Sequence, residues 1–447
     1  MLDALWGAIA NFLHAFYVYL NNIIFNTNLL EKIILVLPYL IFEFPFAVGI
    51  IVVLTLKYWF GFFRKRKANY FPHVTAVITA YNEGHAVRKS IESILNQDYP
   101  GELEIIVVVD GAKQNRLTYE VAKSYEGIHQ EGKKRVLVIP KWERGGRASS
   151  LNLGLNMAKG EIVMALDGDT SFDFDMVRNA VAHFWDDKVV AISGNLRIRN
   201  WNKTLVTRFQ AIEYSISIYM AKQFLDAFGL LNNVSGAFGV FRKDFLKSIG
   251  GWDAGTAEDL DLTLRIKKYK SIYPDIKLGF AEDAIGLTDG PETWKGILKQ
   301  RQRWDGDLAY LFFKKHKSAL NPFITGLKEA FYLYYASLLQ QFALPVFVIL
   351  YYAKLFMKFT VVEVMAIIAF IYLIYAVHTF ILMSFFVAVV SERKSWDIRL
   401  IPYTLLYPIY GFILRINALV AYIDEIFFDA HKRTNYVPPW VAKKSKF

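Results

Sequence analysis

Long apolar runs stand near both ends of this chain, and a helix that crosses a bilayer needs about 20 such residues. Residues 33–63 supply one run, and residues 331–352, 361–390 and 401–428 supply three more. Of the 447 residues, 54% are hydrophobic and 16% are aromatic, which is more than an ordinary soluble protein of this length carries. We therefore expect a membrane protein with a large polar domain between its apolar runs.

The first apolar run contains residues that interrupt a helix. Pro38, Glu43 and Pro45 lie in its first half, so the continuous helix is expected to begin near Phe46. An acid inside a membrane segment is a candidate functional group, and a place at the interface is the simpler interpretation of Glu43. Residues 1–30 are apolar with polar interruptions and lack the features of a secretory signal. They are expected either to span the membrane or to lie in its interface.

Basic residues indicate the orientation of the chain. The cluster from Arg64 to Lys67 directly follows the first apolar run, which predicts that the polar domain lies in the cytoplasm. Three later spans would then put the tail outside, although its basic residues favour the cytoplasm. These residues are His431, Lys432, Arg433, Lys443, Lys444 and Lys446. Either one candidate span is re-entrant or a long one is two spans, and the sequence leaves this open.

Composition excludes several kinds of site and partner. The chain has no cysteine, which excludes disulfides, iron–sulfur clusters, thiolate zinc sites and a cysteine nucleophile. Its net charge of +11 could suit nucleic acid, but the clearest basic cluster flanks a membrane run and no nucleic-acid module is present. We therefore expect contact with the lipid bilayer and none with nucleic acid.

The middle of the chain alternates between strand and helix patterns. Strands are predicted at residues 73–79, 104–109, 135–139, 161–166 and 189–193, and helices at residues 84–96, 114–125, 148–158 and 174–184. A helical segment follows at residues 204–228, another helix at 259–270, and one or two amphipathic helices at 291–317. Such alternation predicts an α/β fold with a mostly parallel sheet covered on both faces.

Acidic residues follow three of these strands. Asp167 and Asp169 end the run EIVMALDGDT, Asp110 ends the second strand, and Glu83 follows the first. Parallel strands share their carboxyl edge, where open α/β sheets bind ligands, and carboxylates there suit a Mg²⁺-type ion shared with phosphates. Each acid alone is more simply a turn or a helix cap, but three on one edge favour a binding site.

Three further segments carry candidate functional groups. In KWERGGRASSLN, Arg147 stands at a helix start, which suits a diphosphate and equally suits a capped surface helix. Glu258 and Asp259 form a tandem acid at another helix start, as a general base or as ordinary partners of the helix dipole. The segment QRQRW, residues 300–304, is either a functional cluster or an interfacial helix with an anchoring Trp304.

In their order and approximate spacing, these motifs resemble the membrane-embedded family-2 glycosyltransferases, the processive synthases of cellulose, hyaluronan, chitin oligosaccharide and poly-N-acetylglucosamine. The motifs are TAYNE, VVVDG, GGRASSLN, DGD, SGAFGVFRK, AEDLDLT and QRQRW. The resemblance covers roughly residues 70–310, and the flanking membrane segments also match. The stretches SGNLRIRNWN and PETWKGILKQRQRW are most similar to the poly-N-acetylglucosamine synthases, and hyaluronan synthases are more distant around the acidic pair.

The resemblance implies a nucleotide-sugar-binding domain of the GT-A type at residues 69–290, inserted between helical membrane segments at 1–68 and 326–428. Interface helices would occupy residues 291–325, and residues 429–447 would form a basic tail. The implied function is an inverting transferase of the plasma membrane. It would polymerise a β-linked polysaccharide from a UDP-sugar, with UDP-GlcNAc as the expected donor, and pass the chain through its own helices. A small accessory membrane subunit is a further expected partner.

Residue roles also follow from the resemblance. Those implied to hold the uracil and ribose are Tyr81, Glu83 and Asp110. Asp167 would support the nucleotide or the donor sugar, and Asp169 would coordinate Mg²⁺ or Mn²⁺ on the diphosphate. Asp259 would be the base, with Glu258 as its neighbour. Those implied to cover the diphosphate and to stack on the acceptor sugar are Gln300, Arg303 and Trp304, and the acceptor would be bordered by residues 235–239, which include Ser235 and Gly236.

The chain departs from the family pattern at two positions. Arg147 stands where the family commonly has lysine, which keeps the charge but changes its shape. Ala112 stands where serine is usual after Asp110-Gly111. Both departures bear on the nucleotide contacts rather than on the family.

Three alternatives remain open from the sequence. The first is a hyaluronan or glucan synthase, and the second adds one sugar to a membrane lipid. Polar and aromatic residues in the predicted spans favour a sugar-lined path, although they also suit an interface belt or helix contacts. These residues are Tyr332, Tyr334, Tyr335, Gln340, Gln341 and His378. The third is a scaffold or transporter without catalysis, which the intact acidic and QRQRW motifs disfavour.

Overall fold

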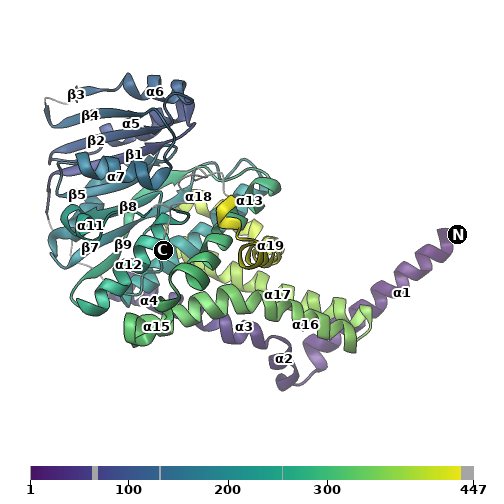
Figure 1. The fold of residues 1–447 in the computed structure, drawn as a ribbon. Coiled ribbons are helices and arrows are strands. Elements are labelled where there is room, and N and C mark those ends of the chain that lie inside the picture. Colours follow the sequence, from purple (N-terminus) through teal and green to yellow (C-terminus); the bar gives the residue numbers. More distant parts are fainter. Residues whose placement is uncertain (1, 63–68, 130–131, 254, 434–447) are drawn as a thin grey trace. The chain divides into compact units, whose positions relative to one another are not determined.

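The computed structural model describes residues 2–62, 69–129, 132–253 and 255–433 (Figure 1). The chain divides into two compact units. The helical unit consists of Met1–Tyr58 and Leu333–Leu419, and the sheet unit consists of Trp59–Tyr332 and Val420–Phe447. Each unit therefore joins segments that are far apart in the sequence.

In its described residues the sheet unit contains one sheet of nine strands, in the order β3-β4-β2-β1-β5-β8-β7-β9-β6 (Figure 1). The strands are β1 Val74–Ala80, β2 Leu103–Asp110, β3 Gly127–His129, β4 Lys134–Lys141, β5 Ile162–Asp167, β6 Ser171–Phe172, β7 Val189–Ile198, β8 Phe238–Arg242 and β9 Lys277–Thr288. Strands β4, β2, β1 and β5 are parallel neighbours, and β7 is parallel to β9. Strands β3, β6 and β8 pair antiparallel. The predicted α/β fold with a mostly parallel sheet is confirmed.

The central strands are apolar because both of their faces are covered. Every residue of β1 and β2 is buried, and their sequences VTAVITA and LEIIVVVD are nearly continuous runs of β-branched and apolar residues. Strands buried on both faces have this pattern rather than an alternating one. The same pattern ends abruptly in polar residues, which lie at the edge of the buried sheet.

Helices connect and cover these strands. They are α5 Val87–Leu95, α6 Arg116–Lys123, α7 Arg147–Met157, α8 Met176–Val181, α9 Leu205–Glu213, α10 Ala221–Ala227, α11 Lys243–Ser248 and α12 Glu258–Ile272. Helix α7 packs closely on β1 at Gly154, where an added Cβ would lie 2.3 Å from a methyl carbon of Val77. Leu151 of α7 and Leu262 of α12 belong to the same buried core, so this core fixes the starts of both helices.

The segments predicted to be helical after the first five strands are helical in the structure. Between α9 and α10 the chain makes a π-helical stretch, Tyr214–Met220, so residues 205–227 are helical throughout. Helix α13, Trp294–Tyr310, carries the QRQRW segment and continues into a π-helical turn, Leu311–Lys315. The hydroxyl of Thr293 caps α13 by accepting a hydrogen bond from the Gly296 amide at 3.1 Å.

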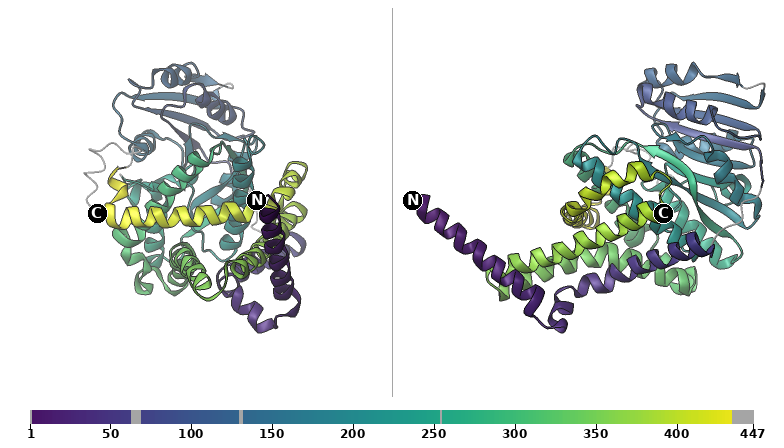
Figure 2. Two further views of the ribbon diagram at one scale, coloured as in Figure 1. Left: turned by 90° about the vertical axis from the view of Figure 1, so that its right-hand side faces the viewer. Right: turned by 180° about the vertical axis from the view of Figure 1, so that it is seen from behind.

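The helical unit is built from helices near both ends of the chain. They are α1 Leu2–Asn21, α2 Leu29–Leu35, α3 Leu37–Phe42, α4 Phe44–Phe60, α16 Leu344–Lys358, α17 Val361–Phe385 and α18 Lys394–Asp397. Helix α17 packs along α1 and α16 (Figure 2). Helix α4 begins at Phe44 rather than near Phe46, because Pro45 sits in its first turn, where its missing N–H costs nothing.

Three helices in the described residues are long and apolar enough to cross a membrane: Leu37–Phe60, Leu327–Lys358 and Val361–Val390. The last candidate span, residues 401–428, is not one straight helix, and a re-entrant segment is one of the alternatives that the sequence leaves open. Lys394–Leu405 and Tyr407–Phe428, the latter being helix α19, meet at a bend of 73°. Pro402 and Pro408 flank the bend, and proline removes a helix hydrogen bond and clashes with the preceding turn.

Glu43 has a charged partner in the helical unit. From the sequence, this residue could be either a functional group or a residue at the membrane interface. It forms an ion pair with Arg415, and its carboxylate also accepts a hydrogen bond from the Tyr375 hydroxyl at 3.2 Å. Nearby, Tyr39 and His378 are hydrogen bonded at 2.9 Å. The basic cluster from Arg64 to Lys67 and the tail residues from Lys443 to Lys446 lie outside the described residues.

Candidate active site

Three neighbouring strands of the sheet end side by side and carry acidic residues to one edge. Thr79 of β1 pairs with Asp167 of β5, and Ala80 pairs with Val109 of β2. Asp110 and Asp167 are the last residues of their strands, and Glu83 follows β1. The structure thus brings the predicted strand-end acids to the same edge, which is where open α/β sheets bind their ligands.

Glu83, Asp167 and Asp169 form a cluster of carboxylates at this edge. Burial, followed by the charges of Asp169 and Asp167, raises the pKa of Glu83 to about 7. Burial and the charge of Asp167 raise the pKa of Asp169 to about 6. Gly168 lets the two aspartates stand this close to the sheet, because a Cβ there would lie 3.0 Å from the Thr79 carbonyl oxygen. The carboxylates therefore repel one another in the protein alone.

The chemistry of this cluster suits a hard divalent cation. Carboxylate oxygens are the ligands that Mg²⁺ and similar ions prefer, and a cation would remove the repulsion that raises the two pKa values. Arg199 holds the base of the cluster in place, since it donates to the backbone oxygen of Asp169 at 3.0 Å and pairs with Asp289 at 2.5 Å. Asp169 could hold the ion predicted from the sequence, and the negative charges of Asp167 and Glu83 would favour a cation there.

The guanidinium of Arg147, at the start of α7, connects three segments. It donates to Asp167 Oδ1 at 2.9 Å, to the backbone oxygen of Gly236 at 2.5 Å, and to Glu258. Burial alone would lower the pKa of Arg147, but the charges of Asp167 and Glu258 raise it above its usual value. The predicted contact of Arg147 with a diphosphate stays a prediction, and the structure adds that this side chain connects the two sides of the site.

Asp110 supports the turn that precedes Arg147. Its two carboxylate oxygens accept hydrogen bonds from Lys141 Nζ at 2.8 Å and from the amides of Gly145 and Gly146 at 2.8 and 2.9 Å. The Gly146 φ of +84° suits glycine far better than other residues. Asp110 is only 5% exposed, so its predicted contact with uracil would be made from a carboxylate that already holds this turn.

Tyr81 directly follows β1 and is exposed. The residue is 40% exposed, and the Arg144 guanidinium lies 4.2 Å from its ring centroid. A flat ring with a guanidinium on one face is a suitable surface for a nucleobase. Arg144 was not predicted, although its place in KWERGG, three residues before Arg147, was a visible signal.

The acidic pair lies at the start of α12, across from the strand edge. Asp259 Oδ2 accepts a hydrogen bond from the Gly236 amide at 2.9 Å, and its Oδ1 accepts one from the Leu260 amide at 2.8 Å. Burial and the neighbouring charge of Glu258 raise the pKa of Asp259 above its usual value. A carboxylate with a raised pKa accepts a proton more readily, as a general base must.

The predicted acceptor segment, which includes Ser235 and Gly236, rests on a buried lysine that the sequence did not reveal. Lys222 donates to Ser193 Oγ at 3.0 Å and to the backbone oxygen of Asn233 at 3.1 Å. Ser193 Oγ in turn accepts from the Ser235 amide at 3.2 Å. Burial lowers the pKa of Lys222 to about 8. No sequence motif marks Lys222, because its partners lie on other elements.

Helix α13 presents the QRQRW residues on two of its sides. Arg301 is buried, pairs with Glu213 at 2.8 Å and lies 4.2 Å from the Trp304 ring centroid. Gln300 Oε1 is buried without a hydrogen-bond partner among the described residues, so a ligand could supply one. One turn beyond Arg303, burial raises the pKa of Asp307 to about 7, with smaller effects from Glu258 and Asp259. The charges of Glu258 and Asp259 thus raise the pKa of a carboxyl group on α13.

The chain matches a known family over just more than half of its length. Residues 72–306 match the family described as "Glycosyltransferase like family 2". The chain is 31% identical over 235 residues to the poly-beta-1,6-N-acetyl-D-glucosamine synthase of Staphylococcus epidermidis, which covers 52% of this chain and 53% of that relative. It is also 31% identical over 248 residues to the probable glycosyltransferase YdaM of Bacillus subtilis, with 54% and 57% covered. The chain matches about half the length of these curated relatives.

Solved structures resemble the chain more weakly. One is a mannosyltransferase, PcManGT of Pyrobaculum calidifontis in complex with GDP-Man and Mn²⁺, with 18% identity and a TM-score of 0.49. The similarity covers 85% of this chain and 99% of that one. Similarity at this level carries no conclusion about the ligands of the present chain.

Proposed function

This chain belongs to the family described as glycosyltransferase like family 2, and from that premise we propose that it polymerises a β-linked polysaccharide from a UDP-sugar with inversion at the anomeric carbon. UDP-GlcNAc is the proposed donor, since poly-N-acetylglucosamine synthases are about 31% identical to the matched half of the chain. The predicted family is confirmed by the match over residues 72–306.

The placement of Arg147 carries this proposal. Its guanidinium bonds Asp167 at the strand edge, Glu258 of the acidic pair and the Gly236 carbonyl of the acceptor segment. A single-displacement transfer needs the donor sugar and the acceptor hydroxyl side by side, with a base behind the hydroxyl. One side chain that contacts both proposed binding regions supports such an arrangement.

On the donor side, Tyr81 and Arg144 would flank the uracil, and Asp110 and Glu83 would contact the base and ribose. Asp167 would orient the donor sugar, and Asp169 would hold Mg²⁺ or Mn²⁺ with help from its neighbouring carboxylates. The ion would supply positive charge to the diphosphate as it leaves. Trp304 would offer its ring to the acceptor sugar, while Gln300 and Arg303 would cover the diphosphate from α13.

On the acceptor side, Asp259 would take the proton of the attacking hydroxyl. The hydroxyl oxygen forms a bond to the anomeric carbon while the bond from that carbon to the UDP oxygen breaks, so UDP leaves with the electron pair. The amides of Gly236 and Leu260 hold the Asp259 carboxylate during this step, and Ser235 and Gly236 border the acceptor. The raised pKa of Asp259 favours proton transfer to it.

We also propose that the helical unit lies in the plasma membrane and passes the product across it. Three helices with the necessary length and apolar composition support this location. The polar contacts among Glu43, Arg415 and Tyr375 within this unit are costly in a bilayer and are therefore candidates for contact with a polar polymer. An accessory membrane subunit remains a further proposed partner.

A donor screen tests the proposed function. The purified full chain is supplied separately with UDP-GlcNAc, UDP-glucuronic acid and UDP-glucose in the presence of Mn²⁺, and UDP release is measured. We expect release with UDP-GlcNAc and a polymeric product that a glycosidase specific for β-linked N-acetylglucosamine degrades. Release with a product that extracts into organic solvent would indicate a lipid acceptor instead. No release with any donor would contradict catalysis altogether.

A further inference from the structure

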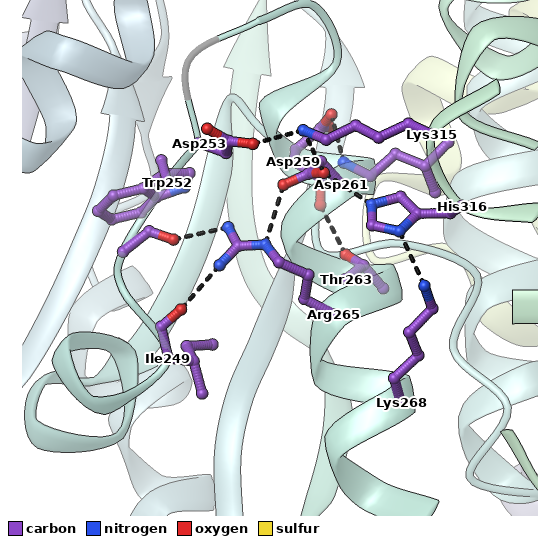
Figure 3. Close-up of polar contacts among 12 residues, drawn as sticks. Ile249, Trp252, Asp253, Asp259, Asp261, Thr263, Arg265, Lys268, Lys315 and His316 are labelled. Carbon is purple, nitrogen blue, oxygen red and sulfur yellow. Dashed lines mark hydrogen bonds and ion pairs between the residues drawn. The ribbon is translucent and has the colours of Figure 1, made fainter. Parts of the chain in front are cut away.

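Two residues beyond the proposed base along α12, the carboxylate of Asp261 lies at the centre of a charged cluster (Figure 3). Its side chain is 1% exposed. Oδ1 lies 2.7 Å from both His316 Nε2 and Lys315 Nζ, and Oδ2 lies 3.0 Å from Arg265 Nε. We call the following set the Asp261 cluster: Asp253, Asp261, Arg265, Lys268, Lys315 and His316.

The cations of the Asp261 cluster hold the loop that leads into α12. Arg265 donates to the backbone oxygens of Ile249 and Gly251 at 2.8 and 2.7 Å, and Lys315 donates to Asp253 Oδ2 at 2.6 Å (Figure 3). Although burial alone raises it, the pKa of Asp261 is held well below its usual range by His316 and Lys315. The cluster therefore favours the charged form of Asp261.

His316 connects this cluster to the end of the QRQRW helix. Its Nδ1 lies 3.0 Å from Lys268 Nζ. A charged ammonium group has donors and no acceptor, so Nδ1 accepts this hydrogen bond. The proton of the imidazole is then on Nε2, which donates to Asp261. The His316 amide closes the π-helical turn after α13 by donating to the Leu311 carbonyl at 2.6 Å. A single imidazole thus joins the last turn of the α13 segment to the first turn of α12.

The first turn of α12 needs such support. Ala257, just before it, has a left-handed φ of +53°, a conformation that costs a non-glycine residue on the order of 1 kcal/mol. The Asp261 amide donates to the Ala257 carbonyl at 2.9 Å, and Asp259 lies between these two residues. Whatever fixes Asp261 therefore fixes the turn that carries Asp259.

We propose that Asp261 and His316 are positioning residues, which set the place of the Asp259 carboxylate by fixing the first turn of α12 against the end of the α13 segment. This inference rests on the proposed role of Asp259. It predicts that weakening the Asp261 cluster slows the transfer step and leaves donor binding intact, because none of its members lies among the residues proposed to bind UDP.

The test uses His316→Ala and His316→Gln in the full chain. Asp261→Asn would take the carboxylate away from two cations, Arg265 and the buried Lys315, and would risk unfolding the protein. His316→Ala removes one partner, whereas glutamine keeps one donor and one acceptor. We expect His316→Ala to lower kcat on the order of 10²-fold with KM for the UDP-sugar nearly unchanged, since small displacements of a reacting group cost rates of this size. His316→Gln should recover most of kcat, and His129→Ala on the edge strand β3 serves as the matched control.

Amide hydrogen exchange provides a readout that does not depend on activity. In His316→Ala the amides of residues 257–264 should exchange faster, while those of β1, β2 and β5 keep their protection. Unchanged kcat in a folded His316→Ala, or a lower kcat without faster exchange at residues 257–264, would overturn the inference. If the unmodified chain released no UDP from any donor, the proposed function would fail, and exchange would still decide whether the cluster holds this turn.

Discussion

At the scale of single residues, the strand edge carries more negative charge than its protein partners neutralise. Burial is the main reason why the pKa values of Glu83 and Asp169 are raised, and the charge of Asp167 raises both further. Arg147 neutralises Asp167 and Glu258 but also connects them, so the site is an electrostatic unit rather than separate motifs. A substitution of one acid should therefore shift the pKa values of the others.

Asp259→Asn tests the base. The amide keeps the shape of the side chain but accepts no proton, and its single oxygen can accept from only one of the two backbone amides, Gly236 or Leu260. Transfer should therefore fall by about 10²- to 10⁴-fold while UDP affinity persists. Turnover is measured by UDP release, and affinity by calorimetry. Asp244→Asn, an exposed acid in the first turn of α11, is the control and should behave like the unmodified chain. Substantial remaining turnover in Asp259→Asn would remove Asp259 from the role of base.

The carboxylate cluster predicts a link between pH, stability and metal. Because the folded protein raises the pKa of Glu83 to about 7 and that of Asp169 to about 6, it binds these protons more tightly than the unfolded chain. Without metal, the free energy of unfolding should therefore fall as pH rises from about 4 to about 7. Mn²⁺ competes with these protons, so it should raise Tm more at about pH 7.5 than at about pH 5.5.

Thermal unfolding with and without Mn²⁺ at the two pH values measures this effect. Asp169→Asn should lose most of the Mn²⁺-dependent increase in Tm. Asp175→Asn, an acid of the same domain at the start of α8, should retain it. An equal increase at both pH values, or an unchanged increase in Asp169→Asn, would place the ion elsewhere.

Sequence patterns located the acids but not their partners. Asp110 and Asp167 were visible because each ends an apolar run at a strand terminus, and Asp169 because it follows Asp167 after one glycine. Lys222 and His316 were not, because Lys222 meets Ser193 from 29 residues away and His316 meets Asp261 from 55 residues away. Burial of a charge depends on tertiary packing, so a single sequence shows such residues only as ordinary polar positions on helices.

At the scale of elements, contacts hold α12 at two points. The Asp261 cluster fixes its first turn, and Lys267 in its third turn forms a buried ion pair with Glu329 of α15, Leu327–Tyr332, at 2.7 Å. Lys267 and Glu329 are 1% and 8% exposed at their side chains. The helix that carries the acidic pair is thus attached to the element at which a candidate membrane span begins.

Glu329→Gln should destabilise the protein by about 3–5 kcal/mol, because it leaves the Lys267 ammonium buried without its charge partner. The double variant Lys267→Met with Glu329→Leu should recover most of this loss, since it removes both charges together. Thermal unfolding in detergent measures both. Glu120→Gln, in the exposed pair with Arg116, should change stability by less than about 1 kcal/mol. Equal stability of the single and double variants would contradict a buried, unpaired charge as the cause.

The order of strands and helices was predictable, whereas the shape of the C-terminal segment was not. Period and length of the apolar patterns identified β1, β2, β4, β5 and β7 and the helices between them. The bend between Leu405 and Tyr407 was missed because residues 401–428 are apolar enough for a span, and composition outweighed the signal of Pro402 and Pro408. The π-helical turns in helical stretches have no such signal, because they differ from α-helix only in hydrogen-bond register.

At the scale of the whole molecule, the end of α19 bears on the side of the membrane on which the chain ends. Three spans after the sheet unit would put this end outside, whereas its basic residues favour the cytoplasm. Lys314, just after α13, donates to Glu425 Oε1 at 2.8 Å and to Asp429 Oδ1 at 2.6 Å, and the rings of Tyr310 and His431 stack at 4.2 Å. Residues from Val420 onward accordingly belong to the sheet unit. Groups in direct contact lie on one side of a bilayer, so we expect Glu425, Asp429 and His431 to lie on the same side of the membrane as Lys314 of the sheet unit. The bent pair would then enter and leave on one side, as its 73° angle suits.

The lack of cysteine makes this topology directly testable, because any introduced cysteine is the only thiol. Ser248→Cys on α11 and Lys432→Cys near the tail are both at exposed positions and should react with a membrane-impermeant maleimide only after the cells are permeabilised. Phe359→Cys, between α16 and α17, should react in intact cells. One candidate span, Leu327–Lys358, separates this position from the sheet unit, so a cytoplasmic sheet unit would put Phe359 outside the cell. Reaction of Lys432→Cys in intact cells would mean that the bent pair crosses the bilayer, and the contacts of Lys314 with Glu425 and Asp429 could not then exist in the membrane.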